Sequence, residues 1–257
     1  MRISTTPGET PTPTMEGRRV MVTGGARGIG FGVAKALIQA GAAVALLDID
    51  SSAVEAAASR IGAVPVQCDV GNESSVQRAV ATCVYELGGL DGAVNNAGIV
   101  TNTAAEEMSA EEFGQVVAVN LTGVFLCARE AGRVMLENRR GSMVNTASGA
   151  AHIVVHPQPQ CSYNASKTAV LGLTRSLAAE WASRGVRVNS VSPGYTMTEL
   201  VQAPALADKH AEWSALTPMG RLAEVDDLVG TYLYLLSDAA RFVTGQDIVV
   251  DGGYTLW

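Results

Sequence analysis

Long apolar runs, an excess of basic residues and closely spaced cysteines are all absent from this sequence of 257 residues. No apolar segment approaches the roughly 18 residues that a membrane-spanning helix requires. The formal net charge of −7 offers no basic face to a nucleic acid or to an anionic membrane. Both classes of partner are therefore excluded, and a small molecule is left as the expected ligand.

Cysteine is scarce, and its four positions are scattered along the chain. They form neither a CxxC motif nor a spacing with histidine that suits a metal ion, so reduced, mostly packed thiols and no metal site are predicted. The four are Cys68, Cys83, Cys127 and Cys161.

The first fourteen residues are rich in Thr and Pro and lack the apolar stretch that a signal peptide carries. We therefore expect residues 1–14 to be disordered and the protein to be cytoplasmic. Met1 and Met15 are both possible natural starts.

Hydrophobic residues form 47% of the chain, in short β-branched runs that alternate with longer helical patterns. This alternation is typical of a parallel sheet that helices cover on both faces, so one α/β domain over residues 15–257 is predicted. The predicted strands are Arg19–Thr23, Ala43–Leu47, Val64–Gln67, Gly92–Asn95, Ser142–Thr146, Val186–Ser190 and Asp247–Val250. The predicted helices are Gly30–Ala40, Ser52–Ser59, Glu73–Leu87, Ala110–Asn138, Ser162–Ser183 and Val225–Leu236.

A glycine-rich segment follows the first predicted strand, with Gly24, Gly28 and Gly30 in the pattern Gly-x3-Gly-x-Gly. Glycine permits a tight turn and lets the backbone approach a pyrophosphate, which the N-terminus of the next helix attracts. Arg27 and Ile29 lie within the same predicted cofactor-binding turn. Close packing of the strand on the helix is an alternative reason for these glycines.

Asp48 follows the second predicted strand, with Ile49 beside it. A carboxylate at this place accepts both ribose hydroxyls of NAD and repels the 2′-phosphate of NADP, so NAD is the predicted cofactor. A simple helix N-cap is the alternative role of Asp48. Arg27 is the one feature that favours NADP, because a basic residue in the turn can meet the 2′-phosphate.

Two further strand ends are expected to contact the cofactor. Asp69, followed by Val70, can hydrogen-bond the adenine amino group after the third strand. The fourth strand ends in a turn of small and polar residues that fits against the cofactor, namely Asn95, Asn96, Ala97 and Gly98.

Tyr163 and Lys167 are four residues apart in a predicted helix, so both side chains lie on one face of it. An unperturbed tyrosine, with a pKa of about 10, is a poor base at neutral pH, but a nearby ammonium and an oxidised nicotinamide lower that pKa. Ser148 offers a hydroxyl for the substrate oxygen, and Asn120 can anchor a water that links Lys167 to solvent. Such a Tyr-x3-Lys pair alone is common in amphipathic helices; its place after the other motifs favours catalysis.

Taken in order, these motifs resemble those of the short-chain dehydrogenase/reductase family over roughly residues 17–257. They are Thr23-Gly24-x3-Gly28-x-Gly30, Asn95-Asn96-Ala97-Gly98, Asn120, Ser148, Tyr163-x3-Lys167 and Pro193-Gly194. The resemblance implies a doubly wound Rossmann fold with a seven-stranded parallel sheet, hydride transfer with a nicotinamide dinucleotide, and a homotetramer.

The resemblance also implies the roles of individual residues. The catalytic tetrad would be Asn120, Ser148, Tyr163 and Lys167, with Lys167 on the nicotinamide ribose as well. The residues bordering the nicotinamide amide would be Pro193, Gly194 and Thr198, with Thr196 as a further cofactor contact.

The segment between Ser148 and Tyr163 is longer than the family usually has, and it should lie over the substrate because both its ends are catalytic. With Glu180-Trp181 and the last eight residues, it looks most like bacterial polyol and sugar-alcohol dehydrogenases. Four polar side chains suit a substrate with several hydroxyls, although a solvated loop is an equal alternative. They are His152, His156, Gln158 and Gln160.

Residues 197–217 are expected to close over the substrate, as the equivalent region does in the family. Met197 and Trp213 are the candidate substrate contacts there, together with His156 and Gln158 from the longer segment. Packing within this lid is the alternative role of Trp213.

The sequence thus favours an NAD-dependent dehydrogenase that acts on a secondary alcohol, most closely a polyol or sugar alcohol. An NADPH-dependent reductase of 3-oxoacyl-type ketones is the alternative enzyme, supported by Arg27. A non-catalytic dinucleotide-binding sensor is a remote third possibility, against which the complete tetrad argues.

Overall fold

The structure, a computed structural model, describes residues 12–199, 201–202 and 204–256. Most of the tail predicted to be disordered, residues 1–11, therefore lies outside the described residues. Met15 is packed in the domain, with a side chain only 1% exposed and a backbone N–H that donates to Ala40 O at 3.0 Å. Among the described residues, no helix has both the length and the apolar character needed to cross a bilayer.

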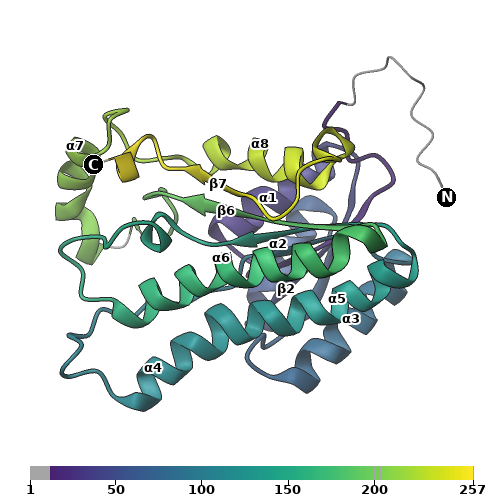
Figure 1. Ribbon diagram of the computed structural model, residues 1–257, viewed down its shortest axis with the longest axis horizontal. Coiled ribbons are helices and arrows are strands. Elements are labelled where there is room, and N and C mark those ends of the chain that lie inside the picture. The colour runs from purple at the N-terminus through teal and green to yellow at the C-terminus, as the bar shows by residue number, and fades with distance from the viewer. Residues whose placement is uncertain (1–11, 200, 203, 257) are drawn as a thin grey trace.

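A parallel sheet of seven strands forms the centre of the described chain, as predicted (Figure 1). Its order is β3-β2-β1-β4-β5-β6-β7, so the direction of winding reverses between β1 and β4. The strands are β1 (Arg19–Thr23), β2 (Ala43–Asp48), β3 (Val64–Gln67), β4 (Gly92–Asn95), β5 (Gly141–Thr146), β6 (Val186–Pro193) and β7 (Asp247–Val250).

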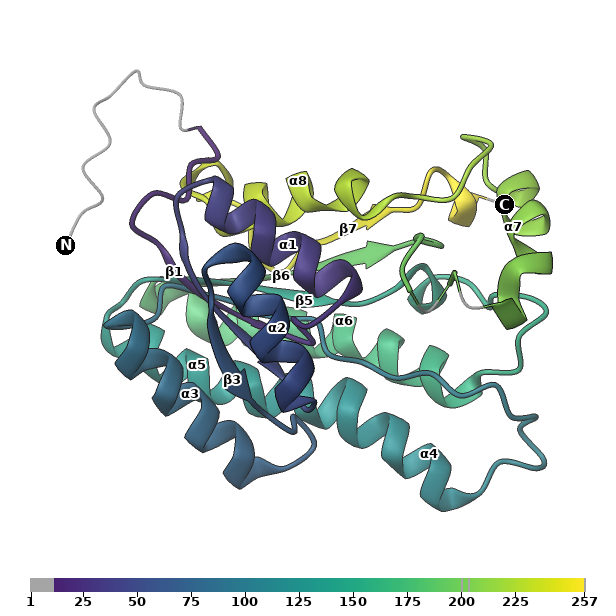
Figure 2. The same cartoon turned by 180° about the vertical axis from the view of Figure 1, so that it is seen from behind.

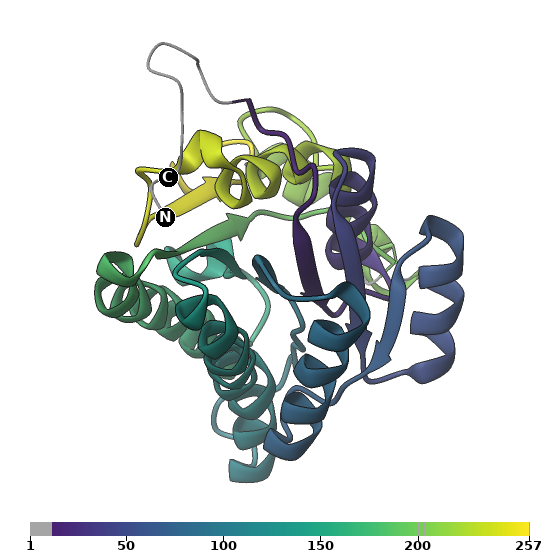
Figure 3. The same cartoon turned by 90° about the vertical axis from the view of Figure 1, so that its right-hand side faces the viewer.

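Helices cover both faces of this sheet, which confirms the doubly wound α/β fold (Figures 1 and 2). One face carries α1 (Gly28–Gln39), α2 (Ser51–Ile61) and α8 (Val225–Leu236). The other carries α3 (Glu73–Leu87), α5 (Val124–Glu137) and α6 (Cys161–Trp181). Figure 3, which is turned by 90°, shows the two helix layers on either side of the sheet.

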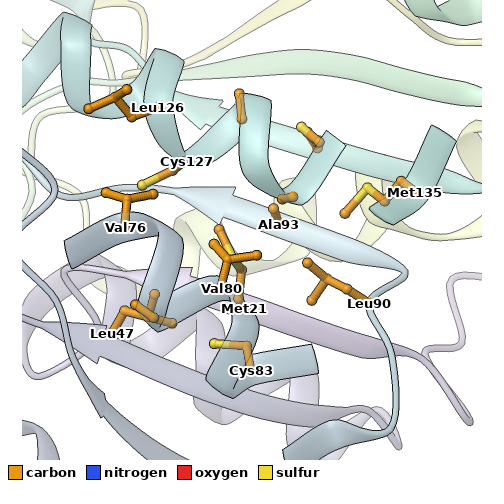
Figure 4. Close-up of a cluster of buried hydrophobic side chains, with 14 of the residues drawn as sticks. Met21, Leu47, Val76, Val80, Cys83, Leu90, Ala93, Leu126, Cys127 and Met135 are labelled. Carbon is orange, nitrogen blue, oxygen red and sulfur yellow. The ribbon is translucent and has the colours of Figure 1, made fainter. Parts of the chain in front are cut away.

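Each layer buries its own apolar cluster, because successive side chains of a strand point to opposite faces of the sheet. In β1, Val20 and Val22 join the cluster under α1, α2 and α8, whereas Met21 joins the one under α3 and α5. Figure 4 shows this second cluster, in which Val76 and Val80 of α3 point toward the sheet. Full burial of such a side chain stabilises the fold by roughly 1.5–3 kcal/mol.

The predicted helix Ala110–Asn138 is the main point at which the fold differs from the sequence prediction. It is divided into α4 (Ala110–Val117), a π-helical turn at Ala118–Gly123, and α5. The Asn120 side chain binds the backbone of Ile99, and a Cβ on Gly123 would lie 2.9 Å from Val70 Cγ2. These tertiary contacts accompany the local widening of the helix, and the helical periodicity of the sequence does not indicate them.

Strand β6 is also longer than predicted, because Ser192 and Pro193 pair with Val249 and Val250 of β7. The sequence did not indicate this extension, because proline and serine are not typical strand residues. The remaining elements are α7 (His210–Leu216) and short 3₁₀ segments at Gly149–Ala151, Ala182–Arg184, Pro204–Lys209, Asp238–Ala240 and Tyr254–Leu256. In Figure 1, α7 lies at the end of the molecule to which β7 leads.

Candidate active site

A pocket of about 460 Å³ opens where the strand order reverses, beyond the carboxyl ends of β1, β4, β5 and β6. In open α/β sheets, ligands bind in the crevice at this position. Eleven of the residues predicted from the sequence line this pocket, one of them Gln160 from the segment between Ser148 and Tyr163, and the other ten belong to the catalytic and cofactor motifs. They are Ile29, Asn96, Gly98, Ser148, Tyr163, Lys167, Pro193, Gly194, Thr196 and Thr198.

The glycine turn between β1 and α1 is packed tightly against the turn after β4. A Cβ on Gly24 would lie 2.9 Å from Ala97 Cα, and one on Gly30 would lie 2.2 Å from Gly24 O. Close packing within the chain therefore requires both glycines, which is the alternative explanation that the sequence left open. Asn96 fixes the same contact, since its Nδ2 donates to Thr23 O at 3.1 Å.

Gly28 is the glycine that faces the open side of this turn. Its φ of +55° favours glycine, and a Cβ there would be 3.3 Å from Thr198 Cγ2 across the pocket. Its backbone N–H belongs to the first turn of α1 and donates to Glu199 Oε2 at 3.1 Å. A carboxylate thus lies at a helix N-terminus, where unpaired N–H groups and the helix dipole attract anions. A dinucleotide pyrophosphate fits this position, because the helix N-terminus attracts an anion and Gly28 has no side chain to keep it away from the backbone.

Asp48, at the end of β2, lies beside the glycine turn. Its Oδ2 accepts from Ala26 N at 3.2 Å and its Oδ1 from Asp50 N at 3.3 Å. The N-cap of α2 is Asp50, whose side chain accepts from Ala53 N at 3.0 Å. The helix-capping alternative for Asp48 is therefore wrong, and its carboxylate remains at the position expected for a ribose ligand.

Arg27 forms an ion pair with Asp50, with 3.6 Å between Nη2 and Oδ2. Both side chains are substantially exposed, at 61% and 45%, so the pair is weak. Asp50 also has a pKa below its ordinary value, mainly because it accepts the hydrogen bonds of Ala53 N–H and the Ser52 hydroxyl. It therefore remains charged beside Arg27 at neutral pH.

The predicted adenine contacts lie near a second cavity of about 480 Å³, which Ile49 and Asp69 line together. Asp69 is exposed, and its Oδ1 accepts from Gly71 N at 2.9 Å. Val70 is buried against Gly123 and lies outside the lining of both cavities. The contacts that these residues would make with the cofactor remain predictions.

Tyr163 and Ser148 meet at the inner end of the first pocket. Helix α6 presents Tyr163 two residues after its start, and Ser148 follows β5. Burial raises the pKa of the Tyr163 hydroxyl above its ordinary value of 10.0, while a hydrogen bond with Ser148 acts in the opposite direction. Burial outweighs this hydrogen bond in the protein alone; the lowering of the Tyr163 pKa expected from a nearby ammonium and an oxidised nicotinamide stays a prediction.

Lys167 lies one turn further along α6, with Nζ 5.6 Å from the centre of the Tyr163 ring. Its ammonium is buried and donates to Thr146 O at 2.7 Å. Burial lowers the pKa of Lys167 from 10.5 to about 8. An ammonium has three protons, so this one hydrogen bond leaves two donors for the hydroxyls of a bound ribose.

Asn120 is fully buried in the π-helical turn, behind Lys167. Its Oδ1 accepts from Ile99 N at 2.8 Å, and its Nδ2 donates to Ile99 O at 2.9 Å and to Ser166 Oγ at 3.2 Å. A Cβ on Gly98 would lie 3.3 Å from Asn120 Oδ1 and 3.5 Å from Lys167 Nζ. Three of the sequence motifs therefore meet here, around a position where even a methyl group would be tight.

The predicted substrate contacts are only partly brought together. His156 is exposed, Gln158 and Met197 are half-buried, and none of the three lines the pocket. Trp213 is 1% exposed and packs behind the pocket wall. His152 instead ties the segment after Ser148 to β7, since its Nε2 lies 2.8 Å from Asp247 Oδ2.

Among the lining residues that sequence analysis missed is Tyr195, which directly follows Pro193-Gly194. Its ring stacks on Trp213 with 4.1 Å between centroids and 9° between planes. Its hydroxyl donates to Gln158 Oε1 at 3.2 Å. The position of Tyr195 after the Pro-Gly pair was the available signal, but an aromatic residue there fits a core position equally well.

Known proteins resemble this chain over nearly its whole length. A family model described as enoyl-(acyl carrier protein) reductase matches residues 24–255. The D-threitol dehydrogenase of Mycolicibacterium smegmatis is 38% identical over 247 residues, which cover 94% of each chain. A probable NADP-dependent mannitol dehydrogenase of Yarrowia lipolytica is 39% identical over 266 residues, which cover 97% of this chain and 95% of the relative.

The fold itself has a close counterpart among solved structures. The crystal structure of a short-chain type dehydrogenase/reductase from Mycobacterium marinum superimposes with a TM-score of 0.91 at 44% identity. The match covers 95% of this chain and 97% of that one.

Proposed function

Because this chain belongs to the short-chain dehydrogenase/reductase family, we propose that it is an NAD-dependent dehydrogenase of polyols or sugar alcohols. It is an oxidoreductase that acts on alcohols with a nicotinamide dinucleotide. The observation that carries the proposal is the meeting of Ser148, Tyr163 and Lys167 in one pocket at the reversal point of the sheet.

Each of these side chains has a chemical role in the proposal. The dinucleotide, when bound, supplies the acceptor or donor of the hydride. The Tyr163 oxygen takes the proton of the substrate hydroxyl during oxidation and returns it during reduction. Ser148 holds the substrate oxygen beside Tyr163, with which it already shares a hydrogen bond. Lys167 holds the nicotinamide ribose with the donors that Thr146 leaves unused.

The remaining cofactor contacts follow from the turns that surround this pocket. The glycine turn, with Gly24, Gly28 and Gly30, would hold the pyrophosphate at the N-terminus of α1. Asp48 would accept the ribose hydroxyls of the adenosine half. The nicotinamide amide would lie against the residues that follow β6, namely Pro193, Gly194, Thr196 and Thr198.

Two features support NAD over NADP. The Asp48 carboxylate is at the end of β2, where it would repel a 2′-phosphate. The guanidinium of Arg27, the one basic group in the turn, is paired with Asp50. Because a relative is a probable NADP-dependent enzyme, the cofactor preference has to be measured on this chain.

The polyol substrate is supported by the relatives, two of which act on D-threitol and mannitol by name. It is tested by a screen of the purified full chain with NAD⁺ and NADP⁺ against tetritols, hexitols, vicinal diols and simple secondary alcohols. Thioester ketones are tested in parallel with NADH and NADPH, and all reactions are followed through NADH or NADPH absorbance. We expect turnover of alditols, with kcat/KM at least about tenfold higher for NAD⁺. Turnover confined to thioester ketones with NADPH would refute both parts of the proposal.

An NADPH-dependent ketone reductase is the second candidate. The Arg27 side chain is 61% exposed, so it can leave the weak pair with Asp50 and meet a 2′-phosphate. The cofactor comparison in the screen separates the two candidates.

A homotetramer is part of the proposal, because large apolar side chains remain exposed on one chain. Phe113 of α4 and Phe125 of α5 are 41% and 39% exposed, and Leu256 near the C-terminus is 77% exposed. Native mass measurement should give four copies, and Phe125→Glu should reduce the assembly. A monomeric full chain would refute the homotetramer.

The cytoplasmic location stays a prediction of the sequence.

A further inference from the structure

Part of the wall of the active-site pocket is aromatic. Tyr195 is held there between two rings, stacked on Trp213 at 4.1 Å and edge-on to Tyr254 at 5.3 Å with 87° between planes. Trp213 is fully buried behind Tyr195, whereas Tyr195 and Tyr254 both line the pocket. Stacked and edge-on contacts of this kind fix the ring plane, so the Tyr195 hydroxyl has a defined position.

The direction of the Tyr195 O–H bond is defined as well. It donates to Gln158 Oε1 at 3.2 Å, and an amide oxygen can only accept. Burial raises the pKa of Tyr195, so its phenol is neutral at any working pH. With the proton directed at Gln158, the phenol oxygen has two lone pairs. The neighbouring Tyr254 hydroxyl can occupy one of them, and the other can accept from a hydroxyl in the pocket.

The neighbouring walls are mostly apolar and offer few other partners for a substrate hydroxyl. Ala150, Val155 and Val201 line the same pocket. Gln160 also lines it, and the hydrogen bond from its Nε2 to Asn164 Oδ1 at 3.0 Å orients its amide. A polar group placed in such an apolar surrounding discriminates strongly between substrates that satisfy it and those that do not.

We propose that Tyr195 determines specificity by accepting a hydrogen bond from a second hydroxyl of the substrate, with Gln158 as a positioning residue that holds the phenol proton. The inference rests on the proposed polyol dehydrogenase activity and names the substrate group that the site recognises. Ser148 and Tyr163 engage the reacting hydroxyl; Tyr195 engages another hydroxyl of the same molecule. A substrate with one hydroxyl would leave the Tyr195 oxygen without this bond.

The test compares a tetritol with butan-2-ol, which has the same number of carbons and a single hydroxyl. Tyr195→Phe keeps the ring stack on Trp213 and removes only the hydroxyl. We expect kcat/KM for the tetritol to fall roughly tenfold, mainly through KM, as expected for one hydrogen bond of about 1.4 kcal/mol. The kcat/KM for butan-2-ol should change less than about twofold. Tyr85→Phe on α3, where the side chain is 83% exposed, is the matched control.

Gln158 is tested by a pair of variants. Gln158→Leu removes the acceptor and should lower the tetritol preference in the direction of Tyr195→Phe. Gln158→Glu keeps an acceptor of the same length and should restore that preference, which a merely structural role of the loop would not require. Thermal unfolding of each variant shows whether the fold is retained.

The outcomes separate this inference from the proposed function. If the wild-type chain oxidises no polyol, the proposed function has failed and the inference falls with it. If the wild-type chain prefers the tetritol and Tyr195→Phe keeps that preference, the inference alone is overturned. An equal loss of both substrates in Tyr195→Phe overturns it too, because the hydroxyl would then serve the pocket as a whole.

Discussion

Glu199 and Gly28 lie 171 positions apart in the sequence, yet the Glu199 carboxylate accepts the backbone N–H of Gly28 at 3.1 Å. This N–H group is in the first turn of α1, where the glycine turn would hold a pyrophosphate. The carboxylate and a cofactor phosphate therefore compete for one donor, and both are anions. The residue next to Glu199, Thr198, lines the pocket, so the contact also connects the lid segment to the cofactor turn.

We predict that Glu199→Gln tightens dinucleotide binding. Removing a competing anion from a helix N-terminus should lower the Kd for NADH roughly threefold to tenfold, with a smaller effect at high salt. Fluorescence titration with NADH at two ionic strengths measures this. Glu212→Gln, which removes the same charge from an exposed pair with Lys209, is the control. A higher Kd in Glu199→Gln would mean that the contact supports the cofactor turn.

Cofactor preference should change when the carboxylate at the end of β2 is removed. Asp48→Ser is expected to raise the ratio of kcat/KM for NADP⁺ over NAD⁺ at least tenfold, because it removes both the ribose acceptor and the repulsion of a 2′-phosphate. Asp50→Ser retains an N-cap for α2 and frees Arg27, so it should raise the same ratio by less. Steady-state kinetics with both cofactors would contradict us if Asp48→Ser left the ratio unchanged.

Tyr163→Phe should abolish turnover while leaving NADH binding within about twofold of the wild-type Kd. The substitution removes the group that exchanges the proton with substrate, and general acid–base catalysis alone contributes roughly 10²–10⁴ in rate. Single-turnover kinetics and an NADH titration on the same preparation measure the two effects. Loss of NADH binding together with activity would show that Tyr163 holds the cofactor and leave its chemical role unsupported.

The pH dependence should differ between the two directions of the reaction. Oxidation needs Tyr163 ionised and Lys167 protonated, whereas burial raises the pKa of Tyr163 above 10.0 and lowers that of Lys167 to about 8. The required state is therefore a minor one, with a maximum at alkaline pH between these two values. Reduction needs both groups protonated, so its kcat/KM should be constant below pH 8 and fall above it. Oxidation that is fastest below neutral pH would contradict this assignment.

Stability can be tested at two helix glycines in the same layer of the fold. Gly114 of α4 has open space where a methyl group would lie, with nothing within 4 Å, so Gly114→Ala should stabilise the protein by roughly 0.5–1 kcal/mol. A Cβ on Gly132 of α5 would lie 2.7 Å from Cη2 of Trp181, so overpacking should make Gly132→Ala destabilising by roughly 1–3 kcal/mol. Chemical denaturation measures both. Equal effects at the two positions would show that helix propensity outweighs packing.

Much of the fold could be predicted because its signals are local. The strands Arg19–Thr23 and Val64–Gln67 and the helix Glu73–Leu87 have the predicted bounds, since each is an apolar or amphipathic run between turn residues. The interruption at Ala118–Gly123 could not be predicted, because it depends on contacts of Asn120 with Ile99 and of Gly123 with Val70. These partners are distant in sequence, and helical periodicity continues through the segment.

The candidate site, too, could be predicted only in part. The motifs around Gly24, Asn96, Ser148 and Tyr163 could be recognised by their order, and the parallel sheet places their strand ends at one edge. The aromatic part of the pocket wall could not be recognised. Trp213 was a candidate substrate contact, but it is buried behind Tyr195, which the sequence did not single out.

Tyr163 thus shows what the sequence by itself determined and what it did not. The order of the motifs determined the chemistry, because residue types and helical spacing specify an acid/base beside an ammonium. Only the tertiary structure decided the surroundings of that chemistry: which rings hold Tyr195, which carboxylate meets Gly28, and in which direction burial shifts the pKa of Tyr163. Such contacts depend on how segments distant in sequence pack together, and packing is a property of the whole fold.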